Sequence, residues 1–201
     1  MSICLAVARF DAGPQPAGRP PAPGRLAYVQ AFLNTFWDLE QPHGGEVWSS
    51  PAAYGAWLEQ RGFRAPVTRA DLDRAVELRE GLRALCLANH DNGHAPQAMA
   101  LLDGLAREVA PGAGLAPSLI DGTLAPAADG PDAACALALG TVFSARLQGS
   151  FARLKACPHE RCGWVFYDTS RNRSGQWCSM RICGNRTKGE AFRRRHGRRQ
   201  V

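Results

Sequence analysis

The chain has no run of eighteen apolar residues, which is roughly what a transmembrane helix needs. It also has no basic stretch ahead of its first apolar run, and Arg9 interrupts that run far short of a cleavable signal peptide. Signatures of catalysis are missing too, because there is no phosphate-binding loop, no dinucleotide fingerprint and no Ser, His and Asp set. We therefore expect a cytoplasmic protein, without membrane contact, that is not an enzyme.

Cysteine is scarce but regularly placed. Four of the seven cysteines form two pairs, Cys157 with Cys162 and Cys178 with Cys183, each with four residues between its members. The odd total and the expected reducing compartment argue against a disulfide framework. We predict one structural zinc ion held by four thiolates, because a closed tetrahedral shell leaves no open position for catalysis. Such an ion contributes about 10 to 16 kcal/mol of apparent binding free energy to folding.

The remaining candidate ligands are two histidines near the cysteine pairs. His159 lies inside the first pair, and His196 follows the last pair by thirteen positions. Neither is expected to bind the metal, since four cysteines already complete the shell. The other three cysteines, Cys4, Cys86 and Cys135, are expected to be ordinary buried thiols.

Positive charge gathers at the end of the chain. Residues 151–201 carry thirteen Lys and Arg against three acids, whereas residues 1–150 carry eleven bases against fifteen acids. This pattern indicates a polyanionic partner, and the alternative is a basic tail that serves solubility alone. Several bases lie between the zinc ligands, where a rigid module would display them, so we predict DNA as the partner. The predicted contacts are Arg171, Arg173, Arg181, Asn185, Arg186, Lys188, Arg193, Arg194 and Arg195, with Arg198 and Arg199 following.

Local patterns predict the elements of this basic region. Residues 163–167 have the aromatic and β-branched content of a short strand, and the polar residues 171–176 predict an exposed loop. Thr187 and Glu190 fit a capping box at the start of a basic helix over residues 188–195. The free backbone amides at the N-terminus of this helix are expected to bind a phosphate group.

Residues 157–188 resemble the CGNR zinc finger, named for the tetrapeptide found here at positions 183–186. The match includes both cysteine pairs, the turn DTSRN at 168–172 and the stretch WCSM at 177–180. The resemblance implies the C-terminal finger of a bacterial transcription regulator, which binds zinc and DNA. The chain departs from the family at 175–176, where basic residues are expected, so one or two phosphate contacts are missing.

Members of the same family usually carry an N-terminal helical domain called ABATE. The recurring LDFxNT mark of that domain is matched in its second half by Phe, Leu, Asn and Thr at 32–35. Trp and Leu at 57–58 and the sequence ELRE at 77–80 match two further patterns. The resemblance as a whole spans residues 24–196 and implies a stress-induced regulator with a helical body.

Periodicity within the first 150 residues independently predicts a helical domain. Apolar residues recur at helical spacing in four segments, and Thr68 with Asp71 forms a capping box for one of them. These segments are 26–37, 68–86, 99–105 and 133–154. Residues 113–125 contain glycines, prolines and alternating leucines, so we expect a small β-hairpin there. The alternating leucines are Leu115, Leu119 and Leu124.

These patterns define a mainly α fold in three parts. Residues 1–24 are rich in proline and are expected to form a flexible leader. Residues 25–154 form the helical domain, which we expect to sense a ligand or to dimerise. Residues 155–201 form a finger of zinc knuckles, one short strand and a basic helix, which is the predicted DNA-binding domain.

Aromatic residues are dense near the start of the helical domain and suggest a pocket for a small-molecule effector. The predicted lining is Asn34, Phe36, Trp37 and Trp57, and the alternative is that these side chains are core. Asn34 in particular is either a hydrogen bonder between helices or a ligand contact.

Three function classes are compatible with the sequence. The first is a zinc-containing DNA-binding regulator that acts as a homodimer at the nucleoid, because one small finger covers few base pairs. The second is an RNA-binding or ribosome-associated module in which Tyr167 stacks on bases. The third is a redox or zinc sensor in which thiolate oxidation releases the metal and changes a protein partner.

Overall fold

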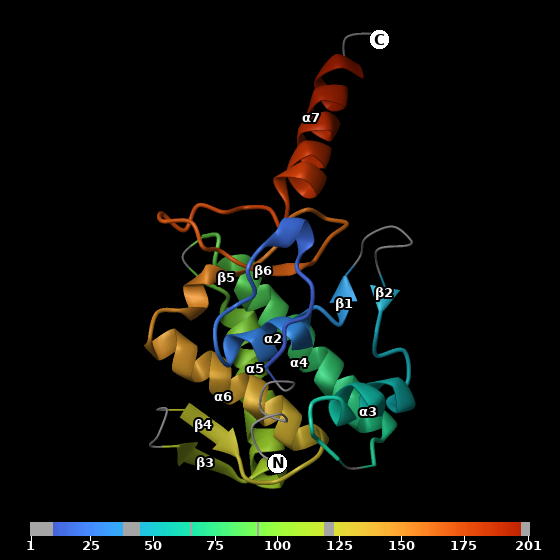
Figure 1. Ribbon diagram of the computed structural model, residues 1–201, viewed down its shortest axis with the longest axis vertical. Helices are drawn as coiled ribbons and strands as arrows, with labels where there is room; N and C mark the ends of the chain where they lie inside the picture. Colours follow the sequence, from blue (N-terminus) through green and yellow to red (C-terminus); the bar gives the residue numbers. More distant parts are fainter. Residues whose placement is uncertain (1–9, 38–44, 65, 92, 119–122, 198–201) are drawn as a thin grey trace.

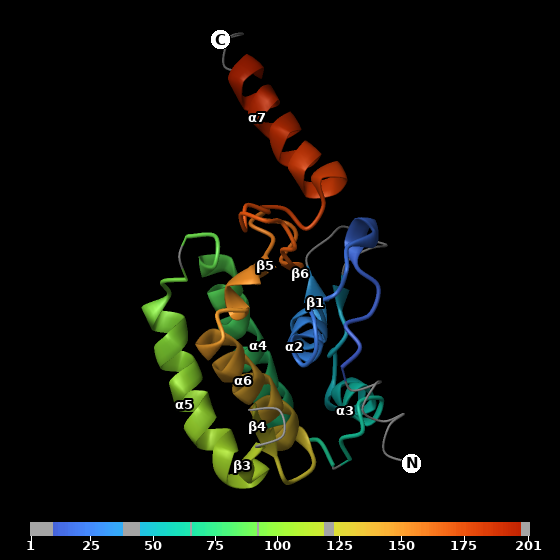
Figure 2. The same ribbon diagram turned by 60° about the vertical axis from the view of Figure 1, so that its left-hand side comes forward.

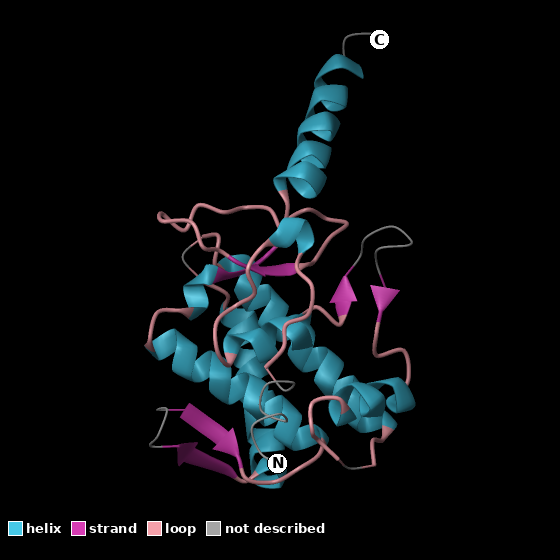
Figure 3. Cartoon of the chain, in the orientation of Figure 1, coloured by secondary structure: helices cyan, strands magenta, loops and turns pink. Residues whose placement is uncertain are grey.

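The computed structural model describes residues 10–37, 45–64, 66–91, 93–118 and 123–197. Over these residues the chain forms six α-helices and three two-stranded antiparallel sheets, with two 3-10 turns and one π-helical turn (Figure 3). The helices are α2 (Leu26–Leu33), α3 (Pro51–Glu59), α4 (Arg69–Ala88), α5 (Pro96–Ala113), α6 (Pro131–Leu147) and α7 (Asn185–Gly197). The strands pair as β1 (Phe36–Trp37) with β2 (Gly45–Glu46), β3 (Leu115–Ser118) with β4 (Thr123–Pro126), and β5 (Leu154–Ala156) with β6 (Val165–Tyr167). The turns are η1 (Pro16–Gly18), η2 (Phe151–Arg153) and the π-helical η3 (Met180–Gly184). The mainly α fold is confirmed.

Helix α4 is the long helix that the capping box predicts. The Thr68 hydroxyl accepts a hydrogen bond from the Asp71 amide, and the Asp71 carboxylate accepts one from the Thr68 amide. One face of α4 packs against α5, where Gly81 allows a close approach: a Cβ on Gly81 would lie 3.1 Å from Leu102 Cδ2. Helices α4, α5 and α6 lie side by side, with α2 and α3 to one side of them and the zinc-binding region above (Figure 2).

The predicted hairpin forms as β3 and β4, with Leu115 opposite Pro126; Leu119 lies outside the described residues. The helix predicted to reach Leu154 ends at Leu147 instead. Gly149, at a φ of +72°, follows it, and the chain then turns through η2 into β5. Positive φ is a conformation that glycine adopts without strain, so it ends the helix in spite of the apolar residues beyond it.

Helix α2 is also shorter than predicted, because Phe36 and Trp37 lie on β1 and not on the helix. The Arg83 guanidinium accounts for this end: its Nη2 donates to the carbonyls of Leu33, at 2.6 Å, and of Phe36, at 3.1 Å. These bonds supply partners for carbonyls that a longer helix would have bonded internally. The helix ends where Arg83 reaches it.

One apolar core extends through the helical body and into the zinc-binding region. It includes Phe151, Leu154, Ala156 and Val165 together with the buried faces of the helices. A second, smaller cluster contains the four zinc-region cysteines and Phe166. Strand β5 therefore belongs to both parts, and the predicted boundary at residues 154 and 155 falls inside that strand.

The proline-rich leader does not behave as a flexible segment over residues 10–24. Ala12 and Ala22 are buried, and the Ala22 amide donates to Gln30 Oε1 at 2.7 Å. Arg19 Nε donates to the Cys178 carbonyl at 2.8 Å, and its guanidinium lies over the Phe166 ring. The prolines fix an extended path across the molecule, so this leader segment packs on the body and on the zinc-binding region. Residues 1–9, which include Cys4, lie outside the described residues.

Among the described residues, no helix combines the length and the apolar composition that a membrane span requires.

Candidate metal centre

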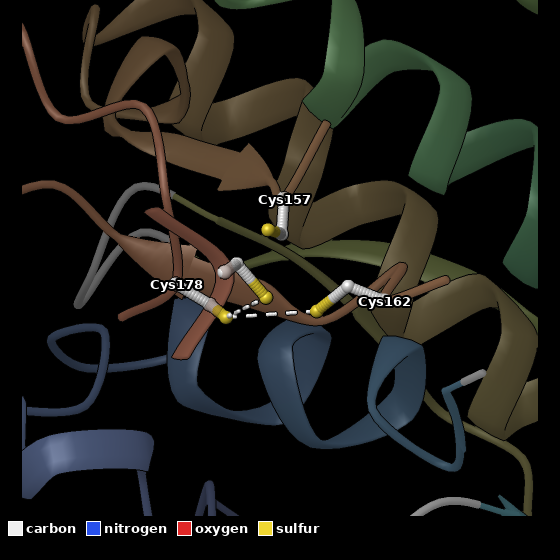
Figure 4. Close-up of side chains that lie close together, drawn as sticks. Cys157, Cys162 and Cys178 are labelled. Carbon is white, nitrogen blue, oxygen red and sulfur yellow. Dashed lines mark hydrogen bonds between the residues drawn. The ribbon is translucent and has the colours of Figure 1, made fainter. Parts of the chain in front are cut away.

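The four predicted cysteines come together at one point of the fold. Cys157 follows β5, Cys162 precedes β6, Cys178 precedes η3, and Cys183 lies within η3. Their Sγ atoms all lie within 4.8 Å of one another, with 3.5 Å between Cys162 and Cys178 and 3.6 Å between Cys178 and Cys183 (Figure 4). A tetrahedral zinc ion with Zn–S bonds of about 2.3 Å separates its sulfurs by about 3.8 Å. The residues present therefore fit one zinc ion.

Burial and charge also suit a metal. All four cysteines are buried. Hydrogen bonds among the four thiols lower the pKa of Cys157 but raise the pKa of Cys178, so without a metal the thiols do not all ionise together. A bound Zn²⁺ deprotonates its thiol ligands outright and balances their charge. Because the shell is closed, the ion would hold the fold together and would not present a reactive site.

The other described cysteines are inert, as predicted. Cys86 and Cys135 are buried away from this centre, and desolvation raises the pKa of each thiol to about 12. A thiol with such a pKa is protonated at neutral pH and is a poor nucleophile or metal ligand.

Position 184, the glycine of the CGNR tetrapeptide, is sterically crowded. A Cβ on Gly184 would lie 2.8 Å from Met180 Sδ, so the exposed Met180 side chain would have to move, and it would lie at a tight 3.3 Å from Trp177 Cδ1. Met180 and Trp177 belong to the WCSM stretch, and Trp177 packs against the cysteine cluster together with Trp164. The two short motifs are therefore parts of one packing arrangement over the metal ligands.

The DTSRN turn is organised around a buried carboxylate. Asp168 Oδ2 accepts from Lys155 Nζ at 3.0 Å and from the Gly175 amide at 2.8 Å, and Oδ1 accepts from the Ser170 amide at 3.0 Å. Burial alone would raise the pKa of Asp168, but the hydrogen bonds from Ser170, Lys155 and Gly175 lower it to about 2. Lys155 Nζ also donates to the carbonyls of Arg173 and Gly175. This ion pair fixes the loop next to the metal.

Gly175 cannot carry the basic side chain expected from the family pattern. A Cβ at this position would lie 2.8 Å from Asp168 Oδ1 and 2.9 Å from its carboxyl carbon. The Asp168 carboxylate thus occupies the space that a side chain at 175 would need, so glycine here serves the loop and not a phosphate contact.

Asn34 joins the helical body to the zinc region. Its Nδ2 donates to the Val165 carbonyl at 2.8 Å, and its Oδ1 accepts from the Val165 amide at 2.7 Å. Gln30 Nε2 donates to the same carbonyl at 3.2 Å. Of the two predicted roles for Asn34, the structure shows the hydrogen bonder. The Asn34 side chain therefore bonds both the carbonyl and the amide of Val165, as the backbone of a neighbouring strand would.

The other three residues of the predicted effector pocket lie in different places. Trp37 packs edge to face on Trp164, with ring centroids 5.4 Å apart. Phe36 lies under the Arg79 guanidinium, and Trp57 packs against Phe32 and Trp48 in the aromatic core. Trp57 thus belongs to the core, Phe36 packs on a residue of the body, and Trp37 contacts the zinc region.

Sequence reasoning missed two arginines that position this region, one buried and one partly buried. Arg79, which is 2% exposed, donates to Glu46 Oε2 at 2.6 Å and to Thr35 Oγ1 at 3.1 Å. Arg83 Nη1 donates to the Gly163 carbonyl in the turn before β6. The ELRE pattern at 77–80 contains Arg79, and a charged residue at a helical core position was the signal that it has a buried partner.

The predicted DNA contacts are exposed or half-buried, and they fall on three elements. Arg171 and Arg173 lie in the loop after β6, and Arg181 lies in η3. The remaining predicted contacts lie on α7, which extends away from the rest of the molecule (Figure 1). They are Asn185, Arg186, Lys188, Arg193, Arg194 and Arg195. Arg198 and Arg199 lie outside the described residues.

Helix α7 does not begin with the predicted capping box. The helical run starts at η3, where Ser179 Oγ accepts from the Ile182 amide, and it continues directly into α7 at Asn185. Thr187 Oγ1 instead donates to the Cys183 carbonyl at 3.0 Å. Because a zinc ligand lies inside the helical run, no free helix N-terminus is present at Thr187 to bind phosphate.

Glu190 also has a different role from the predicted one. Its Oε1 lies 3.6 Å from Nε2 of His159, a buried side chain that follows the first zinc ligand by two positions. This approach links the second turn of α7 to the first cysteine pair.

A helical body joined to a four-cysteine zinc site that continues into a basic helix defines a zinc-finger protein. Family models agree with this description: the CGNR zinc finger matches residues 153–196, and ABATE, described as putative stress-induced transcription regulator, matches residues 26–148. The chain belongs to the ABATE family. Neither matched family is a family of enzymes, and no curated protein matches the chain.

Proposed function

We propose that this protein is a DNA-binding transcription regulator in which zinc holds α7 in position to enter the major groove. The observation that carries the proposal is the basic helix itself. Between Asn185 and Gly197, α7 bears five Lys and Arg against one acid, and it extends away from the body (Figure 2). A thirteen-residue helix is about 20 Å long. The major groove, about 12 Å wide, admits an α-helix.

The bases at the far end of α7 are not engaged by the protein. Arg193 and Arg194 have no ion-pair partner within the described part of the chain, and Arg195 Nε contacts only the Ala191 carbonyl of its own helix, at 3.4 Å. Each base that neutralises a phosphate releases counterions, so affinity falls by roughly 0.9 log units per contact for each tenfold rise in salt. Arginine can also read guanine edges within the groove.

A second group of positive charges supports DNA contact beside the zinc site. Arg19 and Arg181 line a hollow of about 410 Å³ together with Thr169, Ser179 and the Asp168 carboxylate, whose charge is balanced by Lys155. Carbonyls of the zinc region hold Nε and Nη2 of Arg19, while its Nη1 bonds to nothing within the described residues. A backbone phosphate placed here would meet two guanidinium groups and two hydroxyls, which would fix the angle at which α7 meets the duplex.

The helical body is proposed to sense a small molecule or to dimerise, and so to control the finger. What supports coupling is the set of bonds from α2 and α4 to the finger, above all Asn34 to Val165 and Arg83 to Gly163. A change in either helix would move the strand that leads to the metal ligands. A homodimer would also place two copies of α7 on neighbouring half-sites, which suits a single short recognition helix.

The alternatives receive less support. Tyr167, the residue expected to stack on RNA bases, is half-buried and packs on the core. Redox sensing needs an accessible thiolate, whereas Cys157, Cys162, Cys178 and Cys183 are at most 3% exposed.

The deciding experiment is selection from a random DNA pool with the zinc-loaded full-length protein at 0.15 M salt. We expect one enriched sequence, with at least tenfold weaker binding to structured RNA of equal length. A pool without enrichment would exclude a sequence-specific regulator. Equal or tighter binding to RNA would favour the ribosome-associated class.

A further inference from the structure

An apolar cleft lies on the side of the body away from the zinc site. It has a volume of about 340 Å³ and is bounded by α4, α5, α6 and the β3–β4 hairpin. Its floor consists of buried side chains, including Leu82, Leu85, Leu102 and Val142. Met99 and Phe143 stand at the mouth and are 39% and 54% exposed. Apolar surface is therefore left uncovered both inside the cleft and around it.

The size of the cleft suits a small molecule and not a peptide. Ligand sites of small molecules typically measure about 300 to 1,000 Å³. One turn of an α-helix, about 10 Å across and 5.4 Å long, occupies about 420 Å³. A helix from a partner or from a second copy thus exceeds the space, whereas a molecule of one to three rings fits within it.

The hairpin closes one end of the cleft by an unusually close approach to α6. A Cβ on Gly140 would lie 2.8 Å from the Leu124 carbonyl oxygen, so glycine alone allows the strand to lie so near the helix. At another part of the mouth, Arg146 of α6 reaches Met99 of α5, with Nη2 4.0 Å from the sulfur. The cleft is therefore bounded by side chains from both helices and by the hairpin.

The charges at the cleft cancel. Asp103 and Arg146 are its charged lining residues, and neither has an ion-pair partner within the described residues. An ion of either sign would be attracted by one of these side chains and repelled by the other, so the cleft offers no net charge to offset the loss of the ion's hydration, whereas an uncharged ligand loses no such hydration. A hydroxyl or carbonyl on such a ligand can still bond to either side chain.

We propose that this cleft binds an uncharged, largely apolar small molecule. The inference rests on the sensing role proposed for the body and is independent of DNA binding. It also places the ligand away from the predicted pocket of Asn34, Phe36, Trp37 and Trp57. Helix α4 connects the cleft to the zinc region, since Leu82 and Leu85 line the cleft while Arg83, and His90 in the turn after the helix, bond to the zinc region.

The test uses N-phenyl-1-naphthylamine, an uncharged fluorescent probe, with the zinc-loaded full-length protein in the absence of DNA. We expect saturable binding at one site per chain. Competition by 1-alkanols should strengthen with length, by about fourfold for each added CH₂, until the cleft is full. Failure here leaves DNA selection unaffected, so the two proposals fail separately.

Two variants test whether the probe binds in the cleft. Ala106→Phe puts a ring into the lining of the cleft and should weaken probe binding at least tenfold, whereas Ala100→Phe, on the exposed side of the same helix, should leave it unchanged. Phe143→Ser removes the exposed ring at the mouth and should weaken binding about fivefold without unfolding the protein, which thermal unfolding checks.

Three outcomes would overturn the proposal. The first is equal probe binding by the Ala106→Phe and Phe143→Ser variants and the wild type. The second is tighter binding of octanoate or octylammonium than of 1-octanol, which would show a charged ligand. The third is a dimer by sedimentation that dissociates as the probe binds, which would show that a second copy covers the mouth.

Discussion

The zinc module, residues 153–184, and helix α7 are adjacent in sequence but differ in how they are held. Within the zinc module even a lysine is buried, because Lys155 pairs with Asp168, and strand β6 is bonded to α2. Beyond Glu190, the contacts found for the described part of α7 lie within the helix. One example is the Phe192 ring stacked on the His196 ring, with ring centroids 3.9 Å apart. Isolated helices of this length are marginal in water. The difference separates a part built for stability from a part left available for a partner.

Loss of a zinc ligand should have the largest effect. We expect Cys178→Ser to lower bound zinc from one ion per chain to near zero. Because β5 and Val165 belong to the main core, the body should lose stability as well, by at least about 3 kcal/mol, or about 10 °C in Tm. Metal analysis and thermal unfolding measure both effects. An unchanged body transition would mean that the finger folds as an independent unit.

The buried ion pair should come next. Lys155→Met leaves the Asp168 carboxylate buried without its cation, which costs about 3 to 5 kcal/mol. The double variant Lys155→Met with Asp168→Asn should recover part of this loss, since no buried charge then remains. Denaturant unfolding at neutral pH measures the difference. If the single variant is as stable as the wild type, the pair does not organise the loop.

The link between body and zinc module should have a smaller effect. Asn34→Ala leaves the Val165 amide without its partner, which should reduce the free energy of unfolding by about 2 to 3 kcal/mol. Asn172→Ala, an exposed asparagine in the loop, is the matched control and should change it by less than about 0.5 kcal/mol. Hydrogen exchange at β6 should quicken in the first variant. Equal stability of the two variants would contradict the coupling.

The smallest effect on folding is expected for the end of α7. Replacing Arg193, Arg194 and Arg195 together by Gln should change stability by less than about 0.5 kcal/mol, because these exposed side chains form no hydrogen bond or ion pair with the body within the described residues. The slope of log DNA affinity against log salt should become shallower, by the amount that about three phosphate contacts contribute. Titration at several salt concentrations measures this slope. An unchanged slope would move the DNA contacts to another surface.

Local sequence was enough to predict the elements whose signals are local. The spacing of the four cysteines predicted the metal centre, and Thr68 with Asp71 predicted the start of α4. The aromatic run before Tyr167 predicted β6, although its partner β5 was not predicted and the first residue of β5, Leu154, was assigned to a helix. In each successful case the residues that cause the structure lie within a few positions of it, or share one ligand.

Features that depend on distant partners were missed. The end of α2 is set by Arg83, some fifty residues later. The leader segment is held by the zinc module, through Arg19 and Cys178. The start of α7 is set by a zinc ligand inside the helical run, which competes with the capping signal at Thr187 and overrides it. Propensity describes what a segment prefers alone, and tertiary contacts decide these cases.

The bonds between Asn34 and Val165 join residues 131 positions apart, and Arg19 meets Cys178 over 159 positions. A chain emerging from the ribosome makes α2 early, yet the backbone groups that its amide side chains need appear only in the last fifth of synthesis. Until then the Asn34 amide can bond only to water, although Gln30 already has Gln15 and Ala22 as partners, so the end of α2 cannot be fully buried. Burial of α2 during folding therefore waits for synthesis of the C-terminal region. A truncated chain would expose α2 to chaperones and proteases.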